Sequence, residues 1–133
     1  SLHVRRGDYL SDPKTNAAHG LCSLEYYRAA VLHIAEHVER PEFFVFSDDI
    51  AWAKANLEID FPCRYVDHNQ GMESYNDMRL MSLCNHHIIA NSSFSWWGAW
   101  LNPRQDKIVI APRRWFVNAN NVEDLFPAGW VTL

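Results

Sequence analysis

Short apolar runs of strand length alternate along this chain with stretches of helical periodicity, and this alternation limits the possible folds more than any other feature. Strands are indicated at residues 1–4, 43–46, 63–66, 86–90 and 107–111. Helices are indicated after Ser23, over residues 50–57, after Ser74 and after Ser92. Alternation of this kind forms right-handed βαβ units. The sequence therefore predicts an α/β fold, an open parallel sheet with helices on both faces.

Several local features give more detailed predictions. The breakers between residues 10 and 21 indicate a long loop, and residues 113–133 are read as an irregular tail. Ser74 and Asp77 have the spacing of a capping box, and Met78, Met81 and Leu83 are expected to face a core. The tryptophans of residues 96–100 fall at helical spacing and are also expected in the core.

Composition limits the class of protein. The 133 residues are 48% hydrophobic and 14% aromatic, which predicts one ordered domain over residues 1–133. The net charge of −4 gives no general basic surface for nucleic acid, so an anion must be held by a local site. Three widely spaced cysteines indicate reduced, buried thiols. The sequence shows no apolar run long enough to span a membrane and no signal peptide.

Three polar loops follow predicted strands: His3–Asp8, Ser47–Asp49 and Asn91–Phe94. The carboxyl ends of parallel strands lie at one edge of a sheet, where open Rossmann-like sheets bind ligands at a switch in strand order. We therefore expect the three loops to converge on one site.

The residues in these loops suit a nucleotide sugar. Arg5 and Arg6 offer forked donors that match phosphate oxygens. The serine turn at Ser92 opens a predicted helix, whose first N–H groups and dipole favour an anion. Asp48 or Asp49 could accept hydrogen bonds from the N1–H and amino edge of guanine, and His3 could cover the base or sugar. The chain contains neither a G-x-G-x-x-G nor a P-loop motif.

Plainer interpretations exist for some of these residues. An N-cap and a first-turn acid fully account for Asp48 and Asp49, although one can cap while the other binds. The pair His86–His87 opens a strand and is expected to be structural rather than metal-binding. Asn91 begins an N-glycosylation sequon, which we discount because a glycan would block the proposed site.

Three motifs resemble those of fucosyltransferases. His3-Val4-Arg5-Arg6-Gly7-Asp8 is similar to the His-x-Arg-Arg-x-Asp motif of α-1,2- and α-1,6-fucosyltransferases. Two segments, 46–49 and 89–97, resemble further motifs of the α-1,2 group, glycosyltransferase family 11. The resemblance covers residues 1 to about 101. It implies GDP-fucose as donor, inversion at the anomeric carbon, the donor-binding half of a GT-B-like fold, and no metal or other cofactor.

The resemblance also implies roles for individual residues. It places His3 near the nucleotide. It places Arg5 and Arg6 at the pyrophosphate, where one of the two is critical for binding. Asp8 is expected near the reacting sugar or bracing an arginine. Asp8 is also the candidate general base, so the implied catalytic residues are Arg5, Arg6 and Asp8. The implied donor contacts at the two later motifs are Asp48 and Asp49 at guanine and Asn91, Ser92, Ser93 and Phe94 at the phosphates.

The implied activity is that of a galactoside 2-α-L-fucosyltransferase, with a glycan ending in galactose as acceptor. The chain is expected to be a piece of a larger transferase, inactive alone, with possible self-association through the surface left by the missing half. A bacterial cytoplasmic protein, or a Golgi lumenal one in a eukaryote, fits this activity. Two alternatives stay open: a non-catalytic nucleotide-sugar-binding module, and a metal-dependent transferase or phosphohydrolase using Asp48, Asp49 and the histidines.

Overall fold

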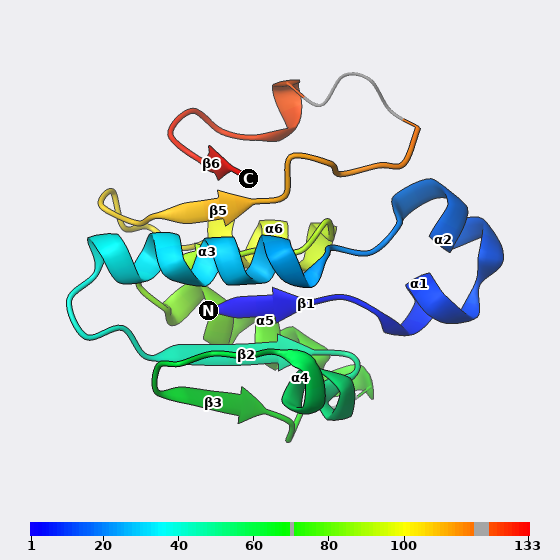
Figure 1. The fold of residues 1–133 in the computed structure, drawn as a ribbon, viewed down its shortest axis with the longest axis horizontal. Coiled ribbons are helices and arrows are strands. Elements are labelled where there is room, and N and C mark those ends of the chain that lie inside the picture. Colours follow the sequence, from blue (N-terminus) through cyan, green and yellow to red (C-terminus); the bar gives the residue numbers. More distant parts are fainter. Residues whose placement is uncertain (70, 119–122) are drawn as a thin grey trace.

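The computed structural model of the chain describes residues 1–69, 71–118 and 123–133, without the side chains of Asp8, Thr15 and Glu123. In that part of the chain, parallel strands form a six-stranded sheet in the order β3-β2-β1-β4-β5-β6 (Figure 1). The strands are β1 (Leu2–Val4), β2 (Phe43–Ser47), β3 (Cys63–Val66), β4 (His87–Ile88), β5 (Val109–Ala111) and β6 (Val131–Thr132). This confirms the predicted open parallel sheet and each of its five predicted strands.

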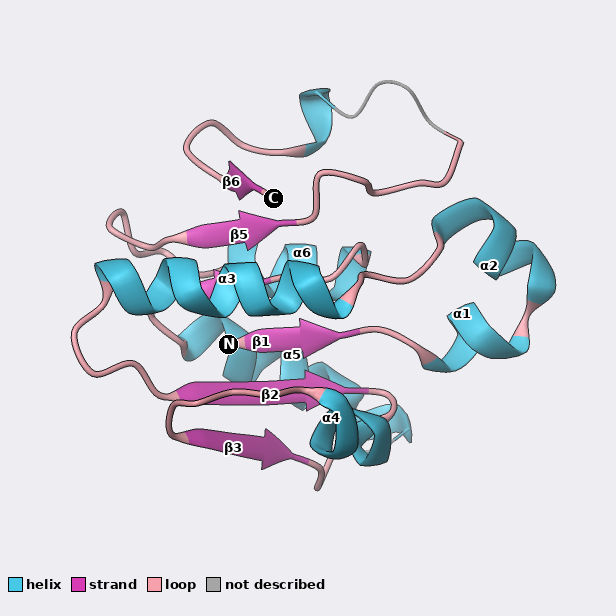
Figure 2. Cartoon of the chain, viewed as in Figure 1, coloured by secondary structure: helices cyan, strands magenta, loops and turns pink. Residues whose placement is uncertain are grey.

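Helices cover both faces of the sheet, as the alternation predicted. Helices α3 (Leu24–His37) and α4 (Ile50–Asn56) lie on one face, and α5 (Ser74–Leu83) and α6 (Ser93–Trp100) lie on the other (Figure 2). The strand order reverses between β1 and β4, since β1 leads to β2 on one side and β4 leads to β5 on the other. The switch point of the sheet therefore lies between β1 and β4.

The predicted loop over residues 10–21 is wrong, because two short helices, α1 (Gly7–Ser11) and α2 (Pro13–His19), occupy it. Asp12 is the N-cap of α2 and its carboxylate accepts from Lys14 N at 3.0 Å, while Pro13 opens the helix. Gly20 closes it with φ +65°. These breakers mark the two ends of a helix. Both helices extend past the carboxyl end of β1 (Figure 1).

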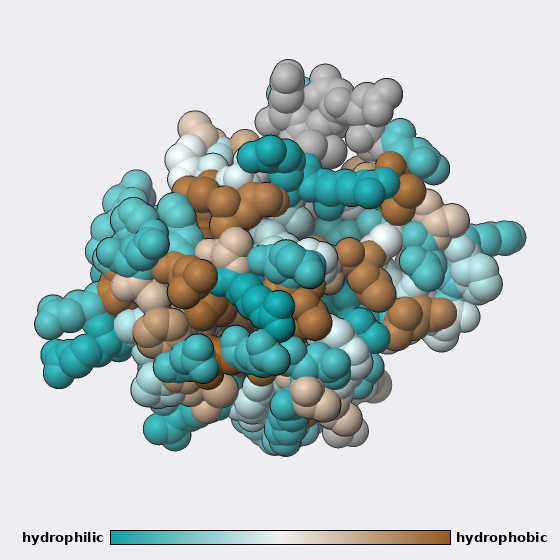
Figure 3. Space-filling model, viewed as in Figure 1, coloured by the Kyte–Doolittle hydropathy of each residue, from teal (hydrophilic) through white to brown (hydrophobic). Residues whose placement is uncertain are grey.

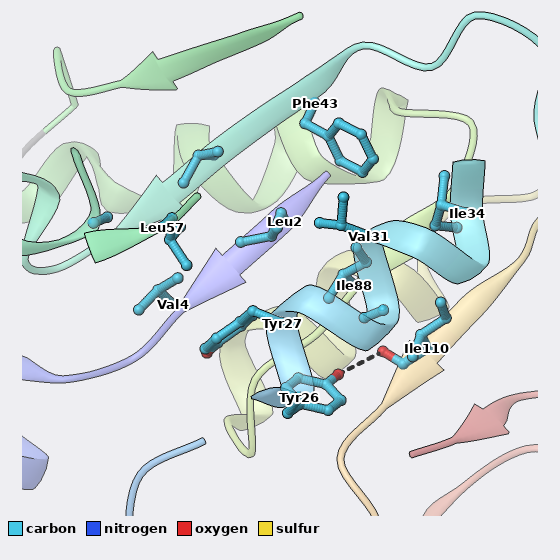
Figure 4. Close-up of a cluster of buried hydrophobic side chains, with 13 residues drawn as sticks. Leu2, Val4, Tyr26, Tyr27, Val31, Ile34, Phe43, Leu57, Ile88 and Ile110 are labelled. Carbon is cyan, nitrogen blue, oxygen red and sulfur yellow. Dashed lines mark hydrogen bonds between the residues drawn. The ribbon is translucent and has the colours of Figure 1, made fainter. Parts of the chain in front are cut away.

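The larger core lies between the sheet and the helices α3 and α4 (Figure 4). Ser23 caps α3, as predicted, with its hydroxyl accepting from Tyr26 N at 3.2 Å. The apolar face of α3 then packs on the sheet through Tyr27, Val31 and Ile34. The Tyr26 hydroxyl donates to the carbonyls of Ile89 at 2.7 Å and Ile110 at 3.1 Å, so one buried phenol ties α3 to the ends of β4 and β5.

On the opposite face, α5 and α6 pack closely through small residues. A Cβ added at Gly98 would lie 3.1 Å from Met81 Cβ, and the neighbouring Ala99 is fully buried. This close approach turns the larger side chains outward, so Trp97 and Trp100 are 48% and 49% exposed. The prediction that these tryptophans belong to the core is therefore wrong for both. Trp96 is half-buried, and its indole N–H donates to Leu125 O at 2.9 Å.

The predictions for α5 are confirmed only in part. Met81 is buried, but Leu83 is 70% exposed. The capping box is wrong: a short 3₁₀ turn (Gly71–Glu73) leads directly into the helix, Glu73 holds the N-cap position and makes no side-chain cap bond, and Ser74 is already helical.

The tail is more regular than expected. A 3₁₀ turn (Glu123–Leu125) precedes β6, which pairs with β5, and Leu133 N donates to Ala111 O at 3.1 Å. The histidine pair has the structural role expected of it. The His87 ring pairs with Ser1 Oγ at 2.9 Å and with Asn102 Nδ2 at 2.7 Å, and His86 Nδ1 accepts from Ile108 N.

The three cysteines, Cys22, Cys63 and Cys84, are free and half-buried rather than fully buried. In the described ranges no helix has the length and apolar character needed to cross a bilayer. On the face that carries α3, hydrophobic residues are interspersed with hydrophilic ones (Figure 3). The large apolar side chains that are exposed include Tyr75, Leu83 and Trp97, and the expected self-association stays a prediction.

Candidate functional site

The three predicted polar loops meet at the carboxyl edge of the sheet, beside the switch point. Residues 5–7 follow β1, residues 48 and 49 follow β2, and residues 91–93 lead from β4 into α6. Two cavities open here. The polar cavity, of about 520 Å³, is lined mainly by His3, Arg5, Ser47, Asp48, Asp67, Asn69, Ser74, Asp77 and Phe94. The aromatic cavity, of about 460 Å³, is lined by Arg5, Tyr9, His19, Asn91, Ser92, Ser93, Phe94, Trp115 and Phe116.

Arg5 lies at the junction, because it lines both cavities. Its Nε is 3.3 Å from Asp48 Oδ2, and its guanidinium carbon is 5.7 Å from the centre of the Tyr9 ring. The guanidinium is thus held between a carboxylate and an aromatic ring. It carries a fixed positive charge to the point where the two cavities meet.

Arg6 has different surroundings and lines neither cavity. Its guanidinium carbon lies 3.6 Å from the centre of the Trp52 ring, and its Nε is 3.6 Å from Asp49 Oδ2. That separation is too long for a hydrogen bond, so the buried Nε has no hydrogen-bond partner among the described residues. Arg6 packs the loop onto α4, and the two arginines are not equivalent.

The carboxylates of Asp48 and Asp49 are both engaged by the protein. Asp48 accepts from Arg6 N and Gly7 N, each at 2.9 Å, so it holds the loop after β1 against the end of β2. Asp49 caps α4 by accepting from Trp52 N at 3.1 Å. The capping interpretation holds for Asp49. Guanine recognition by either residue stays a prediction.

The serine turn presents the N-terminus of α6 to the aromatic cavity. Ser92 holds the N-cap position, but its side chain makes no cap hydrogen bond. The N–H groups in the first turn of a helix have no intrahelical acceptor, and the helix dipole adds positive potential there. Ser92 and Ser93 line the cavity beside Arg5. Together these groups form a site suited to an anion.

Asn91 braces this turn from inside. It is 2% exposed, and its side-chain amide donates to the carbonyls of His19 at 2.9 Å, Gly20 at 3.2 Å and Trp115 at 3.3 Å. Its own carbonyl accepts from the Tyr9 hydroxyl at 2.9 Å. A buried amide with these partners is no glycosylation acceptor, which agrees with discounting the sequon.

His3 forms a wall of the polar cavity. Its ring is 3% exposed and lies 5.6 Å from the Phe94 ring, and its Nδ1 has no hydrogen-bond partner among the described residues. Burial, and then the charge of Arg5, lower the pKa of His3 to about 3. The imidazole is therefore neutral at physiological pH.

Asp77, which the sequence analysis assigned to a capping box, lines the polar cavity instead. Asn69 Nδ2 donates to its Oδ1 at 2.7 Å, and burial raises the pKa of the Asp77 carboxyl despite this bond. A signal for this residue exists in the sequence, because an acid one turn into a helix that follows a strand belongs at the same sheet edge. The catalytic role predicted for Asp8 falls on a side chain outside the described part of the chain.

Metal-ligating side chains do not cluster in the described ranges: no group of three or more histidine, cysteine or acidic residues is placed to hold an ion. A further, mostly apolar cavity of about 710 Å³ lies at the opposite edge of the sheet, where its lining includes Ser1, Phe43 and His86. None of the residues of the three polar loops lines it. The arginine and serine loops therefore define the candidate site.

Comparison with known proteins agrees with this geometry. A family model described as Glycosyl transferase family 11 matches residues 1–133. The chain is 46% identical over 134 positions to the O-antigen biosynthesis glycosyltransferase WbnK of Escherichia coli, covering all of this chain and 44% of that protein. It is 44% identical to an Escherichia coli alpha-1,2-colitosyltransferase, covering 47% of that protein.

A more distant relative is the human galactoside alpha-(1,2)-fucosyltransferase 1, 30% identical over 101 residues, which are 75% of this chain and 28% of that protein. The chain spans less than half the length of these curated relatives. No solved structure matches it. With the family match over its whole length, the chain belongs to glycosyltransferase family 11.

Proposed function

We propose that this chain is the donor-binding part of an α-1,2-fucosyltransferase with a GT-B-like architecture. The full-length protein would transfer L-fucose from GDP-fucose, with inversion, to a galactoside hydroxyl of a glycan. Family membership and the relatives' activities support the reaction class. The observation that carries the proposal is the position of Arg5, which stands between two cavities and beside the N-terminus of α6.

In this proposal the pyrophosphate lies at the junction of the cavities. Arg5 supplies a guanidinium that matches phosphate oxygens, and the first turn of α6 supplies N–H groups and the positive end of a dipole. These donors face the oxygen atoms on which negative charge develops as the bond from sugar to phosphate breaks. Arg5 is therefore the arginine we assign to the pyrophosphate, and Arg6 holds the loop in place.

The guanine base fits the polar cavity. Asp77 lines this cavity, and a carboxylate matches the N1–H and amino group of guanine. We assign base recognition to Asp77 rather than to Asp48 or Asp49, because those two already bind the backbone of the chain. The neutral His3 ring lines the same cavity and can cover the nucleoside.

The transferred sugar then occupies the aromatic cavity, on the other side of Arg5. Aromatic rings such as Tyr9 and Trp115 suit the apolar face of a hexose, and Ser92 and Ser93 can bond to its hydroxyls. Inversion requires the acceptor hydroxyl to attack from the face opposite the pyrophosphate. The part of the protein that lies outside this chain would supply most of the acceptor site.

The name of one relative suggests a second donor. The colitosyltransferase relative is 44% identical across this chain. Colitose is L-fucose without its 3-hydroxyl group, so a site built for one sugar needs few changes to accept the other. Full-length protein assayed with GDP-fucose and with GDP-colitose, under the same conditions, identifies the donor by the ratio of kcat/KM.

The proposal is tested by nucleotide binding and transfer. By calorimetry, full-length protein should bind GDP more tightly than ADP or UDP, because buried acceptors left unpaired reject the wrong base. It should form an α-1,2-fucosylated product from a galactose-ended acceptor, whereas the 133-residue chain alone should bind GDP weakly and transfer nothing. Equal affinity for the three nucleotides, or GDP binding without transfer by the full-length protein, contradicts the proposal and favours a non-catalytic module or another donor.

A further inference from the structure

His19 is a wall of the aromatic cavity and lies close to Arg5. It ends α2, and its ring stacks on Tyr9 with centroids 5.0 Å apart and planes at 19°. On another side its ring contacts Phe116 at 5.1 Å. The Tyr9 ring that it stacks on is the ring over which the Arg5 guanidinium lies. The ring of Tyr9 therefore separates the imidazole from Arg5, the side chain that we propose binds the pyrophosphate.

The main chain at His19 is fixed by contacts from two other segments. The buried amide of Asn91 donates to the carbonyls of His19 and Gly20. Val117 N donates to Ala18 O at 2.8 Å, which ties the last turn of α2 to the segment that carries Phe116. A side chain on such a braced element, with rings on two sides, keeps a defined position, as a group that acts on a substrate must.

Other histidines near the sheet are not available for proton transfer in the same way. His87 uses both ring nitrogens in hydrogen bonds, and His86 accepts from a backbone N–H. The pKa of His3 is lowered to about 3, which makes its imidazole a weak proton acceptor. In His19, Nδ1 is buried and has no hydrogen-bond partner among the described residues. The ring packs on Tyr9 and Phe116, and neither of these contacts is a hydrogen bond to a ring nitrogen.

We propose that His19 is the general base that removes the proton from the acceptor hydroxyl. This inference rests on the proposed inverting transfer, with the donor sugar in the aromatic cavity. The acceptor oxygen forms a bond to the anomeric carbon while its proton passes to Nε2 of the His19 ring, because Nδ1 is buried. The bond from that carbon to the phosphate oxygen breaks, and its electron pair leaves with GDP, whose new charge faces Arg5 and the first turn of α6.

The charged and titratable groups around His19 come from three segments. Arg5 and Tyr9 line the same cavity, from the loop after β1 and from α1. Arg114 belongs to the segment that carries Phe116, and its Nη2 donates to Val117 O at 3.1 Å. Asp8 also belongs to α1, so its carboxylate is the rival base that an experiment must separate from His19.

The test uses the full-length protein with substitutions at His19. His19→Gln keeps a polar side chain without a useful base, and His19→Phe keeps an aromatic ring for the stack with Tyr9. Each should lower kcat by about 10²- to 10⁴-fold, the usual contribution of general base catalysis. GDP affinity by calorimetry should stay within about threefold of the wild type, because His19 lies outside the proposed pyrophosphate and base contacts.

The pH profile separates a base from a structural residue. Wild-type kcat should fall at acidic pH as the base becomes protonated, and this acidic limb should be absent from the residual activity of His19→Gln. His37→Gln, on the last turn of α3, is the matched control and should keep the wild-type kcat and profile. Thermal melts of each variant show whether the fold is retained.

Three results would overturn the proposal. The first is a kcat for His19→Phe equal to that of the wild type. The second is an acidic limb of the pH profile that persists in His19→Gln. The third is an acidic limb that disappears in Asp8→Asn but persists in His19→Gln. The last of these assigns the base to Asp8. Failure of the wild-type protein to bind GDP or to transfer fucose contradicts the proposed function instead, so the two hypotheses fail separately.

Discussion

Replacing Arg5 by alanine should weaken GDP binding far more than replacing Arg6. Arg5 lines both cavities, whereas Arg6 lies against Trp52 and lines neither. Loss of a forked, charge-assisted contact to phosphate costs about 2–4 kcal/mol, or roughly 30- to 1000-fold in affinity. Arg5→Lys should not restore this affinity, because an ammonium group lacks the planar fork.

The structure predicts the reverse order for stability. The Arg5 ion pair with Asp48 is partly exposed to solvent, so its removal should cost less than about 1 kcal/mol. Arg6 is 15% exposed and stacks on Trp52 at 3.6 Å, a cation–π contact that contributes about 1–2 kcal/mol when desolvated. Arg6→Ala should therefore lower the Tm, and Arg5→Ala should leave it almost unchanged.

Calorimetric titration of GDP and a thermal melt of the same samples measure both quantities. The two variants should differ in opposite ways: Arg5→Ala should lose affinity for GDP, and Arg6→Ala should lose stability. Arg6→Ala with the larger loss of affinity and an unchanged Tm would refute the assignment of Arg5 to the pyrophosphate. Unchanged affinity in both variants would remove the pyrophosphate from this loop altogether.

Four further predictions follow from other parts of the molecule. Asp77→Asn should reduce the preference for GDP over ADP by about 10-fold or more, as measured by calorimetry. An unaltered preference would assign base recognition to Asp48 or Asp49 instead. Fucose transfer by full-length protein should persist in excess chelator, because Arg5 and the start of α6 supply positive charge; activity restored only by Mg²⁺ or Mn²⁺ would contradict this. The free energy of unfolding should fall as pH drops from about 6.5 towards 3: the pKa values of buried His3 and His87 are about 3, so the unfolded chain binds more protons in this range. Urea melts at pH 7.5 and pH 5 measure that fall, and equal midpoints would argue against it. Gly98→Ala should cost about 1–3 kcal/mol in a thermal or urea melt, because the added Cβ would lie 3.1 Å from Met81 Cβ, and an unchanged midpoint would mean that α5 and α6 can separate at no cost.

The strands and the main helices were predictable because their signals are local. Four branched or aromatic residues in a row, as in Phe43–Phe46, fit a strand buried on both faces, and the spacing from Leu24 to Val38 fits one helical face. The helices over residues 7–19 were missed because Asp12, Pro13 and Gly20 were counted as breakers without regard to their order. An aspartate before a proline opens a helix, and a glycine after the last turn closes it.

The outward tryptophans could not be predicted from the sequence of α6 alone. Helical spacing shows that residues share a face, but not which face is buried. That choice depends on the neighbouring helix, because α6 packs against Met81 of α5 through its small residue Gly98. Trp97 and Trp100 then lie on the other side. A non-local contact of this kind has no signal within either helix.

The site also depends on contacts between segments that are distant in the sequence. Sequence reasoning treats every polar residue of a motif as a ligand for the substrate, whereas the motifs of this chain also bind one another. Asp48 holds the loop that carries Arg5, and Asn91 holds the end of α2 that carries His19. A substitution of Asp48 or Asn91 should therefore reduce activity by displacing another residue. Asp77 and His19 also line the cavities, and both lie outside the segments that carry the motifs, so a search for motifs alone does not find them.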